Sequence, residues 1–228
     1  MIAVDNIDVT MCDVKDLGKA YHAWYRNIAN RNLAYVRNKT VAKQFNYKEE
    51  LGVWHIPTIL HTYPKAAELL KNRGLTSFDV GVDVGCGTVT FFDFVSVKCA
   101  FVLDIVFEYC CFMKAKNKIA LNSNAENLPF PTDFADVVVC SDILEHVLSF
   151  DTALSEVFRI LKPGGILVVD VPWNQMLSGT LADFSHLRTF NQDNLKPRFN
   201  KFVILDQAVI PSQYGWIGHI VIIMQKPY

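Results

Sequence analysis

The sequence carries almost no net charge and lacks the Cys-x-x-Cys spacing. Its 22 lysine and arginine residues nearly balance 23 acidic residues, so the formal net charge is −1. No global field therefore draws the chain to nucleic acid or to an anionic membrane. None of the six cysteines belongs to a Cys-x-x-Cys pair, so a disulfide framework is not expected and we interpret the thiols as reduced.

Long apolar runs and a secretory start are also missing. Charged side chains interrupt the most apolar region at Asp93, Lys98, Asp104 and Glu108, so no run reaches the roughly 18 residues that a membrane helix needs. The first residues have neither a basic start nor a long apolar block, which argues against a secretory signal. We therefore expect a cytoplasmic protein with no membrane span and no nucleic-acid partner.

Hydrophobic residues make up 51% of the chain, enough for a sizeable core. The first 75 residues show helical patterning without a clear strand, because apolar side chains recur every three or four positions within 17–28 and 59–70. Gly74 then provides a helix stop. We expect an N-terminal helical segment, residues 1–75, that either packs on the rest of the chain or covers an active site as a lid.

From Phe78 onward, short apolar stretches alternate with helical ones. Strands are expected near residues 80–84, 100–104, 119–124, 136–141, 165–171, 201–207 and 219–226, and helices near 89–96, 106–117 and 151–162. Asp151 is the expected cap of the last helix. The first five strands are rich in Val, Ile and Leu without strict alternation, as in a parallel sheet that helices cover on both faces. The pattern predicts an α/β domain, residues 76–228, with a Rossmann-like, mostly parallel sheet of seven strands.

A glycine turn follows the first of these strands. Asp83 ends the strand, and Gly85, Cys86 and Gly87 lead into the next segment. Glycine permits backbone angles that a side chain penalises, and it lets a ligand approach the N–H groups at a helix start. Open α/β sheets bind nucleotides and other anionic ligands in this way.

Polar residues also follow the next three strands. Asp104, with Ile105 after it, stands roughly 20 residues beyond Asp83, where a doubly wound fold offers a carboxylate to ribose hydroxyls. The alternative for Asp104 is helix capping. After the third strand, the Asn124 amide and the main chain of Ala125 and Glu126 can read an adenine edge, or can form only a turn. The fourth strand delivers Ser141, Asp142, Glu145 and His146 to the same edge of the sheet.

Five segments resemble, in order and spacing, the class I S-adenosylmethionine-dependent methyltransferases: residues 82–87, 103–104, 124–131, 134–147 and 159–168. The similarity covers roughly residues 78–172. It implies that S-adenosylmethionine is the cofactor, bound by Asp83, Gly85, Cys86, Gly87, Asp104, Ile105, Asn124, Ala125, Glu126 and Ser141. In that family, the glycine turn lines the methionine part, the acid of the second strand holds the ribose, and the segment at 124–125 meets adenine. Ser141 would lie near the methionine amino group.

Three features depart from the family pattern. Val89 stands where a third glycine is usual, and the segment from Gly87 to Asp104 is short, with residues 90–97 poor in helix formers. Because the side chain at position 89 is β-branched, we expect the turn to have a different shape from that of the family. Asn124 replaces the more usual aspartate, and its amide oxygen still offers an acceptor to the adenine amino group.

His186, Arg188 and Phe190 resemble the His-x-Arg-x-Phe stretch of a methyltransferase subgroup that acts mostly on small molecules. We therefore expect methyl transfer from S-adenosylmethionine to a small-molecule acceptor, through an oxygen, nitrogen or carbon nucleophile that stays open. The oligomeric state also stays open, a homodimer being one option. His186 is the first candidate for substrate contact or general base, and His146 is the second.

No metal site is expected, because His55 and His61 have no Cys, Asp or Glu at ligand spacing. Two other function classes remain. A nicotinamide-dependent oxidoreductase would also have the strand, the glycine turn and the acidic residue. The segments at 124–131 and 162–165 argue against this class, because a dinucleotide-binding fold does not need them. A non-catalytic methyltransferase-like binding protein fits the valine at position 89 and the short segment that follows it.

Overall fold

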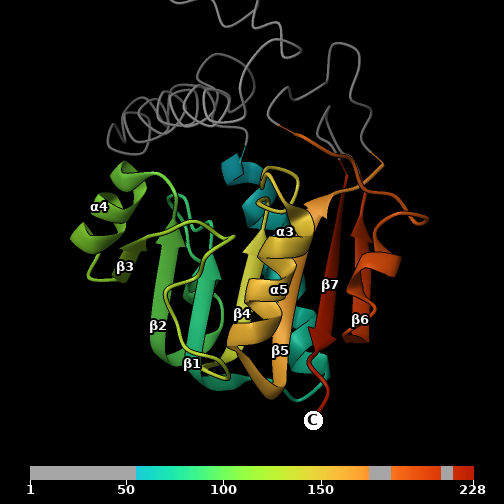
Figure 1. The fold of residues 1–228 in the computed structure, drawn as a ribbon, viewed down its shortest axis with the longest axis horizontal. Helices are drawn as coiled ribbons and strands as arrows, with labels where there is room; N and C mark the ends of the chain where they lie inside the picture. The colour runs from blue at the N-terminus through green and yellow to red at the C-terminus, as the bar shows by residue number, and fades with distance from the viewer. Residues whose placement is uncertain (1–54, 175–185, 212–217) are drawn as a thin grey trace, which may run out of the picture. The chain divides into compact units, whose positions relative to one another are not determined.

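The computed structural model describes residues 55–174, 186–211 and 218–228 (Figure 1). These residues belong to one compact unit that runs from Trp54 to Tyr228. The expected helix within residues 17–28 lies outside the described residues, as does most of the expected lid. The division into residues 1–75 and 76–228 therefore stays a prediction.

Seven strands form a single sheet in the order β3-β2-β1-β4-β5-β7-β6. They are β1 (Ser77–Val84), β2 (Ser96–Asp104), β3 (Ile119–Asn122), β4 (Ala135–Ser141), β5 (Leu161–Pro172), β6 (Val203–Ile210) and β7 (His219–Gln225). Strands β1 to β5 pair in parallel, whereas β7 runs antiparallel to both β5 and β6. The expected α/β class and mostly parallel seven-stranded sheet are confirmed.

The strand order places β1 between β2 and β4. The chain therefore moves outward from β1 to β3, returns to β4, and continues toward the other edge. Such a reversal creates a crevice beyond the carboxyl ends of the central strands, where doubly wound sheets bind ligands. In Figure 1 the arrowheads of β1, β2 and β4 point to this common edge.

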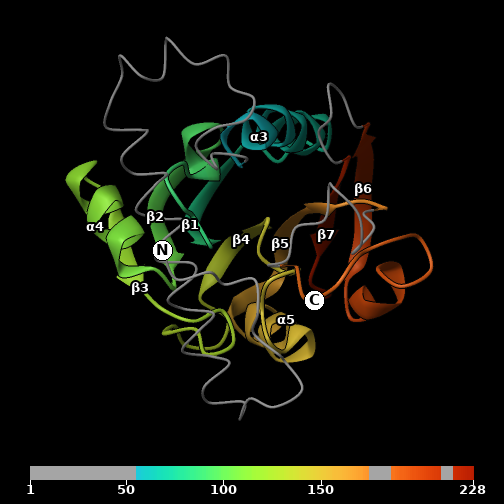
Figure 2. The same cartoon turned by 90° about the horizontal axis from the view of Figure 1, so that it is seen from above.

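Helices cover both faces of the sheet, as Figure 2 shows for α3 and α5. Helix α3 (His55–Asn72) packs Tyr63 and Leu70 against one set of strand residues, and α5 (Phe150–Ile160) packs on the other set. The two sets alternate along the strands, Val137, Val139 and Val168 on the α3 side and Val138, Cys140 and Leu167 on the α5 side. Helix α4 (Phe107–Ala115) covers β2 and β3. Among the described helices, none is long and apolar enough to cross a membrane.

Helix α5 begins and ends slightly earlier than the sequence predicts. Its N-cap is Ser149, whose side chain accepts a hydrogen bond from the Thr152 N–H, so the expected cap Asp151 is wrong. Asp151 instead lies in the first turn, where its charge favours the helix dipole. The helix stops at Ile160 because Leu161 already has an extended conformation and starts β5.

The helix expected near residues 89–96 is reduced to one 3₁₀ turn, η1 (Phe91–Asp93). Strand β2 already begins at Ser96, which leaves no room for further turns. The ring of Phe92 lies so close to Gly81 in β1 that a β-carbon there would come within 2.6 Å of it. This aromatic segment therefore packs directly on the sheet instead of forming a helix.

Candidate functional site

The residues predicted to bind a ligand gather at the carboxyl ends of four adjacent strands, β3, β2, β1 and β4. The loops that carry them are joined through the end of β2. The carbonyl of Leu103 accepts hydrogen bonds from the N–H groups of Gly85 and Cys86 at 2.8 and 2.9 Å, and the carbonyl of Asp104 accepts one from Ser123 at 3.0 Å. The predicted cofactor residues thus share one edge of the sheet.

Two glycines give the turn after β1 its shape. Gly85 and Gly87 have φ angles of +81° and +51°, which side chains rarely adopt. A β-carbon on Gly85 would also come within 2.8 Å of the Ile143 side chain, so no larger residue fits between β1 and the segment after β4. A β-carbon on Gly87 would have no heavy atom within 4 Å. Gly87 therefore borders open space, as a ligand that approaches the main chain requires.

Val89 fits this turn without backbone strain. It is not one of the described non-glycine residues with positive φ, and its N–H donates to the Cys86 carbonyl at 3.2 Å. Its side chain packs against the same apolar cluster as Phe91. The backbone at position 89 does not need glycine here, so the valine alone gives no reason to expect a distorted turn.

Asp83 holds the segment that follows the turn. Its Oδ2 accepts hydrogen bonds from Thr90 Oγ1 at 2.6 Å and from the Phe91 N–H at 2.9 Å. Its Oδ1 is buried with no hydrogen-bond donor among the described residues. Burial raises the pKa of Asp83 to about 6. A ligand or water that donates to Oδ1 would offset the free-energy cost of this unpaired atom.

Asp104 bridges the glycine turn and the start of α4. Its Oδ2 accepts from the Gly87 N–H at 3.0 Å, and its Oδ1 accepts from the Val106 N–H at 2.8 Å. The local capping role is thus observed. Each carboxylate oxygen still has a second lone pair, so two ribose hydroxyls can also donate to this group. Burial raises the pKa of Asp104 to about 6.

Ile105 and Cys86 contribute in different ways. Ile105 is exposed beside Asp104 and offers an apolar surface at the edge of the site. The Cys86 side chain is buried beneath α4 with Val102 and Cys110, and burial raises the pKa of its thiol. Only the main chain of Cys86 is therefore placed to meet a ligand.

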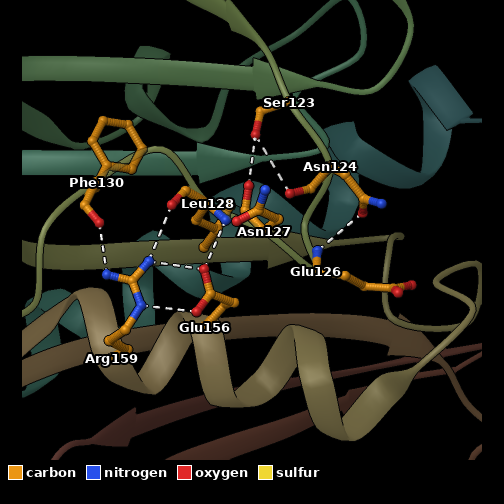
Figure 3. Close-up of polar contacts among 8 residues, drawn as sticks. All are labelled: Ser123, Asn124, Glu126, Asn127, Leu128, Phe130, Glu156 and Arg159. Atoms are coloured by element: carbon orange, nitrogen blue, oxygen red, sulfur yellow. Dashed lines mark hydrogen bonds and ion pairs between the residues drawn. The ribbon is translucent and has the colours of Figure 1, made fainter.

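The segment after β3 forms a tight turn at the same edge (Figure 3). The Asn124 Oδ1 accepts from the Glu126 N–H at 2.9 Å, while Ala125 is buried and Asn124 is exposed. The Glu126 carboxylate accepts from the Ser149 N–H at 3.0 Å and so joins the turn to the start of α5. The Glu126 side chain therefore has a structural role. Only the main chain of Glu126 is left for the expected ligand contact.

Arg159 and Glu156 of α5 clamp the rest of this segment (Figure 3). The Arg159 guanidinium donates to the carbonyls of Phe130 and Leu128 at 2.7 and 3.0 Å. Glu156 accepts from the Leu128 N–H at 2.8 Å and pairs with Arg159 at 2.8 Å. Two side chains of one helix thus hold the backbone that carries the expected adenine contacts.

Ser141 lies at the end of β4 within a buried polar network. Its hydroxyl donates to Asp170 Oδ2 of β5 at 2.9 Å. Tyr63 of α3 is buried beside it; burial and the charge of Asp83 raise the pKa of Tyr63, and a hydrogen bond with Ser141 opposes this shift. Sequence analysis missed Asp170, although a lone acid within the apolar run 166–172 is a signal, because unpaired acids are seldom buried.

His219, the first residue of β7, belongs to the same network. Its Nδ1 lies 3.0 Å from Asp170 Oδ1 and 3.5 Å from Asp142 Oδ1. Burial lowers the pKa of His219, but the two carboxylates outweigh burial and raise the pKa to about 9. Asp142 itself has a φ of +49°, an uncommon conformation for a non-glycine residue that recurs at functional sites.

His186 and His146, the two predicted catalytic candidates, lie against each other. Their ring centroids are 4.7 Å apart with an interplanar angle of 69°. Both rings are buried, and Glu145 Oε1 lies 3.9 Å from His146 Nε2. Sequence analysis named each histidine separately and could not foresee that they meet.

The His-x-Arg-x-Phe stretch holds His186 in this position. Arg188 donates to the carbonyls of Leu144 and Leu148 at 2.7 and 3.1 Å. Phe190 is buried in the core that α5 also joins. The stretch therefore fastens His186 to the turn that carries His146.

The strand order, the antiparallel β7 and a ligand edge at the β1–β4 reversal define the Rossmann-like methyltransferase fold. The chain superimposes on the N-methyltransferase NodS from Bradyrhizobium japonicum, solved with S-adenosylhomocysteine, with a TM-score of 0.64 over 83% of this chain and 98% of that one, at 13% identity. A putative sarcosine dimethylglycine methyltransferase from Galdieria sulphuraria superimposes with a TM-score of 0.60. The match covers 74% of this chain and 86% of that one, at 14% identity. The same fold occurs in SpnF, described as a [4+2]-cyclase, with a TM-score of 0.60. That match covers 81% of this chain and 85% of SpnF, at 16% identity.

Sequence similarity narrows the fold to a family. Residues 82–169 match the family described as a methyltransferase domain. The ubiquinone/menaquinone biosynthesis C-methyltransferase UbiE of Vibrio campbellii is 51% identical over 49 residues, which are 22% of this chain and 19% of that protein. UbiE of Pasteurella multocida is 36% identical over 86 residues, which are 38% of this chain and 31% of that protein. Over residues 82–169 the chain is therefore similar to the class I S-adenosylmethionine-dependent methyltransferases, and the aligned segments span about a fifth to a third of the UbiE relatives.

Proposed function

We propose that the chain binds S-adenosylmethionine at the common edge of β1 to β4 and transfers its methyl group to a small-molecule acceptor. The observation that carries this proposal is the geometry of Asp104. Its carboxylate is fixed by the Gly87 and Val106 N–H groups, so it stands beside the glycine turn with lone pairs left for ribose hydroxyls.

Two further features fit this cofactor. The open space beside Gly87 leaves room for the methionine part against the main chain. The unpaired Oδ1 of Asp83 offers a buried acceptor near the same turn. Asn124 and Ala125 would contact the adenine, and Ser141 would lie near the amino group of the methionine.

The protein's task in the reaction is to bind, orient and exclude water. The cofactor supplies an already activated methyl group, so no covalent nucleophile from the protein is needed. Holding the acceptor in line with the methyl group contributes several kcal/mol through proximity. His186 and His146 are the candidates for a general base, because an imidazole with a pKa near neutrality can take a proton from the acceptor.

The similar proteins support a small acceptor. The UbiE names refer to C-methylation in ubiquinone/menaquinone biosynthesis, and NodS is named as an N-methyltransferase. Because both carbon and nitrogen occur as acceptor atoms in these names, the acceptor atom of this chain is not assigned.

A second candidate function is a different reaction, or binding alone, on the same fold. It is favoured by the likeness to SpnF, whose description names a cyclase. Calorimetry with S-adenosylhomocysteine and turnover with small acceptors separate the two. Cofactor binding without methylation of any quinone-like, amine or hydroxyl acceptor would favour this second candidate.

The cofactor assignment is tested by titrating the full chain with S-adenosylhomocysteine and, separately, with NADH. We expect the first to bind and the second not to bind. Asp104→Ala should weaken S-adenosylhomocysteine binding by at least about tenfold, because it removes a charged acceptor for two hydrogen bonds. Asp93→Ala is the matched control, since Asp93 is exposed and, among the described residues, its side chain makes a surface ion pair with Lys118 at 2.6 Å. Binding of NADH alone, or unchanged affinity in Asp104→Ala, would contradict the assignment.

A further inference from the structure

A buried group of ligand-type side chains lies outside the proposed cofactor contacts. It consists of Glu145, His146 and His186, whose ligand atoms all lie within 4.8 Å of one another. Their relative exposures are 1%, 8% and 9%. Two of the three come from the turn after β4, and the third comes from the stretch beyond β5. We name these three residues the Glu-His-His cluster.

The carboxylate of Glu145 is the unusual member of the cluster. Both of its oxygens are buried and have no hydrogen-bond donor among the described residues. A buried carboxylate without a donor is costly, and proteins usually pair such a group with a cation or use it to coordinate a metal.

The spacing suits a shared ion better than a direct hydrogen bond. Glu145 Oε1 and His146 Nε2 are 3.9 Å apart, too far for a hydrogen bond. Two ligands of one ion, each at about 2.1 Å from it, lie at most about 4.2 Å apart. The ligand atoms of all three residues lie within 4.8 Å of one another.

Hydrogen bonds hold the backbone around the Glu-His-His cluster in place. The Leu187 N–H donates to the Glu145 carbonyl at 2.9 Å. The Arg188 guanidinium donates to the carbonyls of Leu144 and Leu148 on either side of Glu145 and His146. These bonds fix the loop of His186 against the turn after β4, so the three ligands are held together before any ion arrives.

The neighbouring acidic group has a cation already. Asp142 and Asp170 face His219, whose Nδ1 lies 3.5 and 3.0 Å from them. A protonated imidazole balances those carboxylates, so that group does not require a metal. In the Glu-His-His cluster, Glu145 Oε1 lies 3.9 Å from His146 Nε2, beyond hydrogen-bond distance, and neither Glu145 oxygen has a hydrogen-bond donor among the described residues.

We propose that Glu145, His146 and His186 bind a divalent first-row transition-metal ion of the Zn²⁺ type. Two imidazoles and one carboxylate form the donor set of many such sites, and they leave coordination positions open for water or a substrate oxygen. The expectation of no metal site considered only His55 and His61, whereas this set assembles from segments far apart in the sequence.

Histidines that ligate an ion cannot also act as general bases, so the ion would activate the acceptor in place of His146 and His186. Ile143, whose side chain abuts the Gly85 turn, lies two residues before Glu145. An ion in the cluster would therefore sit at the same edge of the sheet as the glycine turn, where it could bind an oxygen of the acceptor and lower the pKa of that oxygen. This role rests on the proposed function, but metal binding itself does not.

Metal binding is tested on the full chain after chelator treatment, in the absence of S-adenosylmethionine. Calorimetry with Zn²⁺, Mn²⁺ and Mg²⁺ should show one Zn²⁺ site per chain, weaker Mn²⁺ binding and the weakest response with Mg²⁺. Glu145→Gln and His186→Ala should each lower Zn²⁺ affinity by at least about tenfold. His61→Ala is the matched control, since His61 is exposed on α3 and lies outside the cluster.

Two further measurements keep the result independent of folding and of the cysteines. Metal-free Glu145→Gln should melt at or above the temperature of the metal-free wild type, because it removes a buried carboxyl group whose oxygens have no hydrogen-bond donor among the described residues, and Zn²⁺ should no longer raise that temperature. The Co²⁺-loaded wild type should show a spectrum without thiolate charge transfer. Absence of Zn²⁺ binding in the wild type, wild-type affinity in Glu145→Gln, or a thiolate spectrum would overturn the proposal. Intact Zn²⁺ binding without any cofactor binding would support this site and count only against the proposed function.

Discussion

Gly87 and Gly74 share a left-handed backbone conformation but border different surroundings. Their φ angles are +51° and +73°, and a β-carbon on either would have no heavy atom within 4 Å. Gly74 ends α3, whereas Gly87 stands in the turn between Asp83 and Asp104. At the scale of single residues, the two glycines are sterically alike, and only Gly87 belongs to the proposed cofactor site.

Alanine at each position should separate these effects. Gly87→Ala and Gly74→Ala should each lower the free energy of unfolding by about 1–2 kcal/mol, the cost of a side chain in the left-handed region. Only Gly87→Ala should weaken S-adenosylhomocysteine binding, by at least about tenfold, because its methyl group would occupy the ligand's approach to the main chain. Denaturant unfolding and calorimetry measure the two effects. Equal binding losses in both variants would show that the turn does not contact the cofactor.

Asp104 should make cofactor binding depend on pH. Its pKa is raised to about 6 by burial, so the native state holds the proton more tightly than the unfolded chain does. The stability that this proton contributes is full below about pH 4 and is lost as the pH rises through about 6. Ribose hydroxyls donate to the ionised form, so affinity changes in the opposite direction. S-adenosylhomocysteine affinity should fall by up to about tenfold per pH unit below about pH 6.

Asp104→Asn tests this assignment. The amide keeps the size of the side chain but does not titrate, so the variant should bind more weakly at about pH 7 and show a flatter profile down to about pH 5. Asp83, whose pKa burial also raises to about 6, stays in place and accounts for any residual slope. A profile as steep as that of the wild type would assign the pH dependence to Asp83 instead.

At the scale of elements, α5 determines where the expected adenine contacts lie. The segment after β3 has no regular structure of its own, and Arg159, Glu156 and the Glu126–Ser149 contact attach it to this helix (Figure 3). Side chains of α5 thus hold the backbone of a loop that we propose contacts the cofactor.

Arg159→Ala should weaken both stability and cofactor binding. Truncation leaves the carbonyls of Leu128 and Phe130 without their donors, which should cost about 1–3 kcal/mol of stability. The loosened loop should lower S-adenosylhomocysteine affinity several-fold. The control is Arg198→Ala, because within the described part of the chain the Arg198 side chain makes a 3.9 Å contact with exposed Asp151 and a ring contact with Phe150. This control should cost at most about 1 kcal/mol and leave binding unchanged.

At the scale of the whole molecule, α3 is part of the sheet domain. Tyr63, Ala66, Leu69 and Leu70 are buried against Val137, Val139, Val168 and Ile223 of the sheet. Of the two readings offered for the N-terminal segment, packing on the sheet is therefore the one that holds for this helix. The region before it lies outside the described residues.

Truncations should show the difference. A chain that starts at Trp54 should unfold in one cooperative transition, since the compact unit begins there. A chain that starts at residue 76 should lose cooperative unfolding and aggregate, because it exposes the apolar face that α3 covers. Circular dichroism during denaturation, with light scattering, measures both. A stable, cooperative 76–228 chain would place the domain boundary at residue 75 after all.

The element pattern, and the gathering of the predicted cofactor residues at one edge of the sheet, could be predicted because their signals are local. A buried strand shows as an apolar run and a tight turn shows as glycine, so the seven strands, α4, α5 and the turn at 85–87 lie close to their expected places. In a parallel sheet, the residues after each strand must reach one edge. The gathering of Asp83, Asp104, Asn124 and Ser141 therefore follows from the strand order.

Other features depend on contacts between distant parts of the chain, which local pattern does not encode. The space left between β1 and β2 reduced an expected helix to η1, and packing allowed valine at position 89 without strain. The partnership of His146 with His186, and of Asp170 with His219, arises only when separate strands and loops are packed together. The sequence alone determines which side-chain groups are available. Only the tertiary fold determines the distances between them, because those distances depend on how separate strands and loops pack.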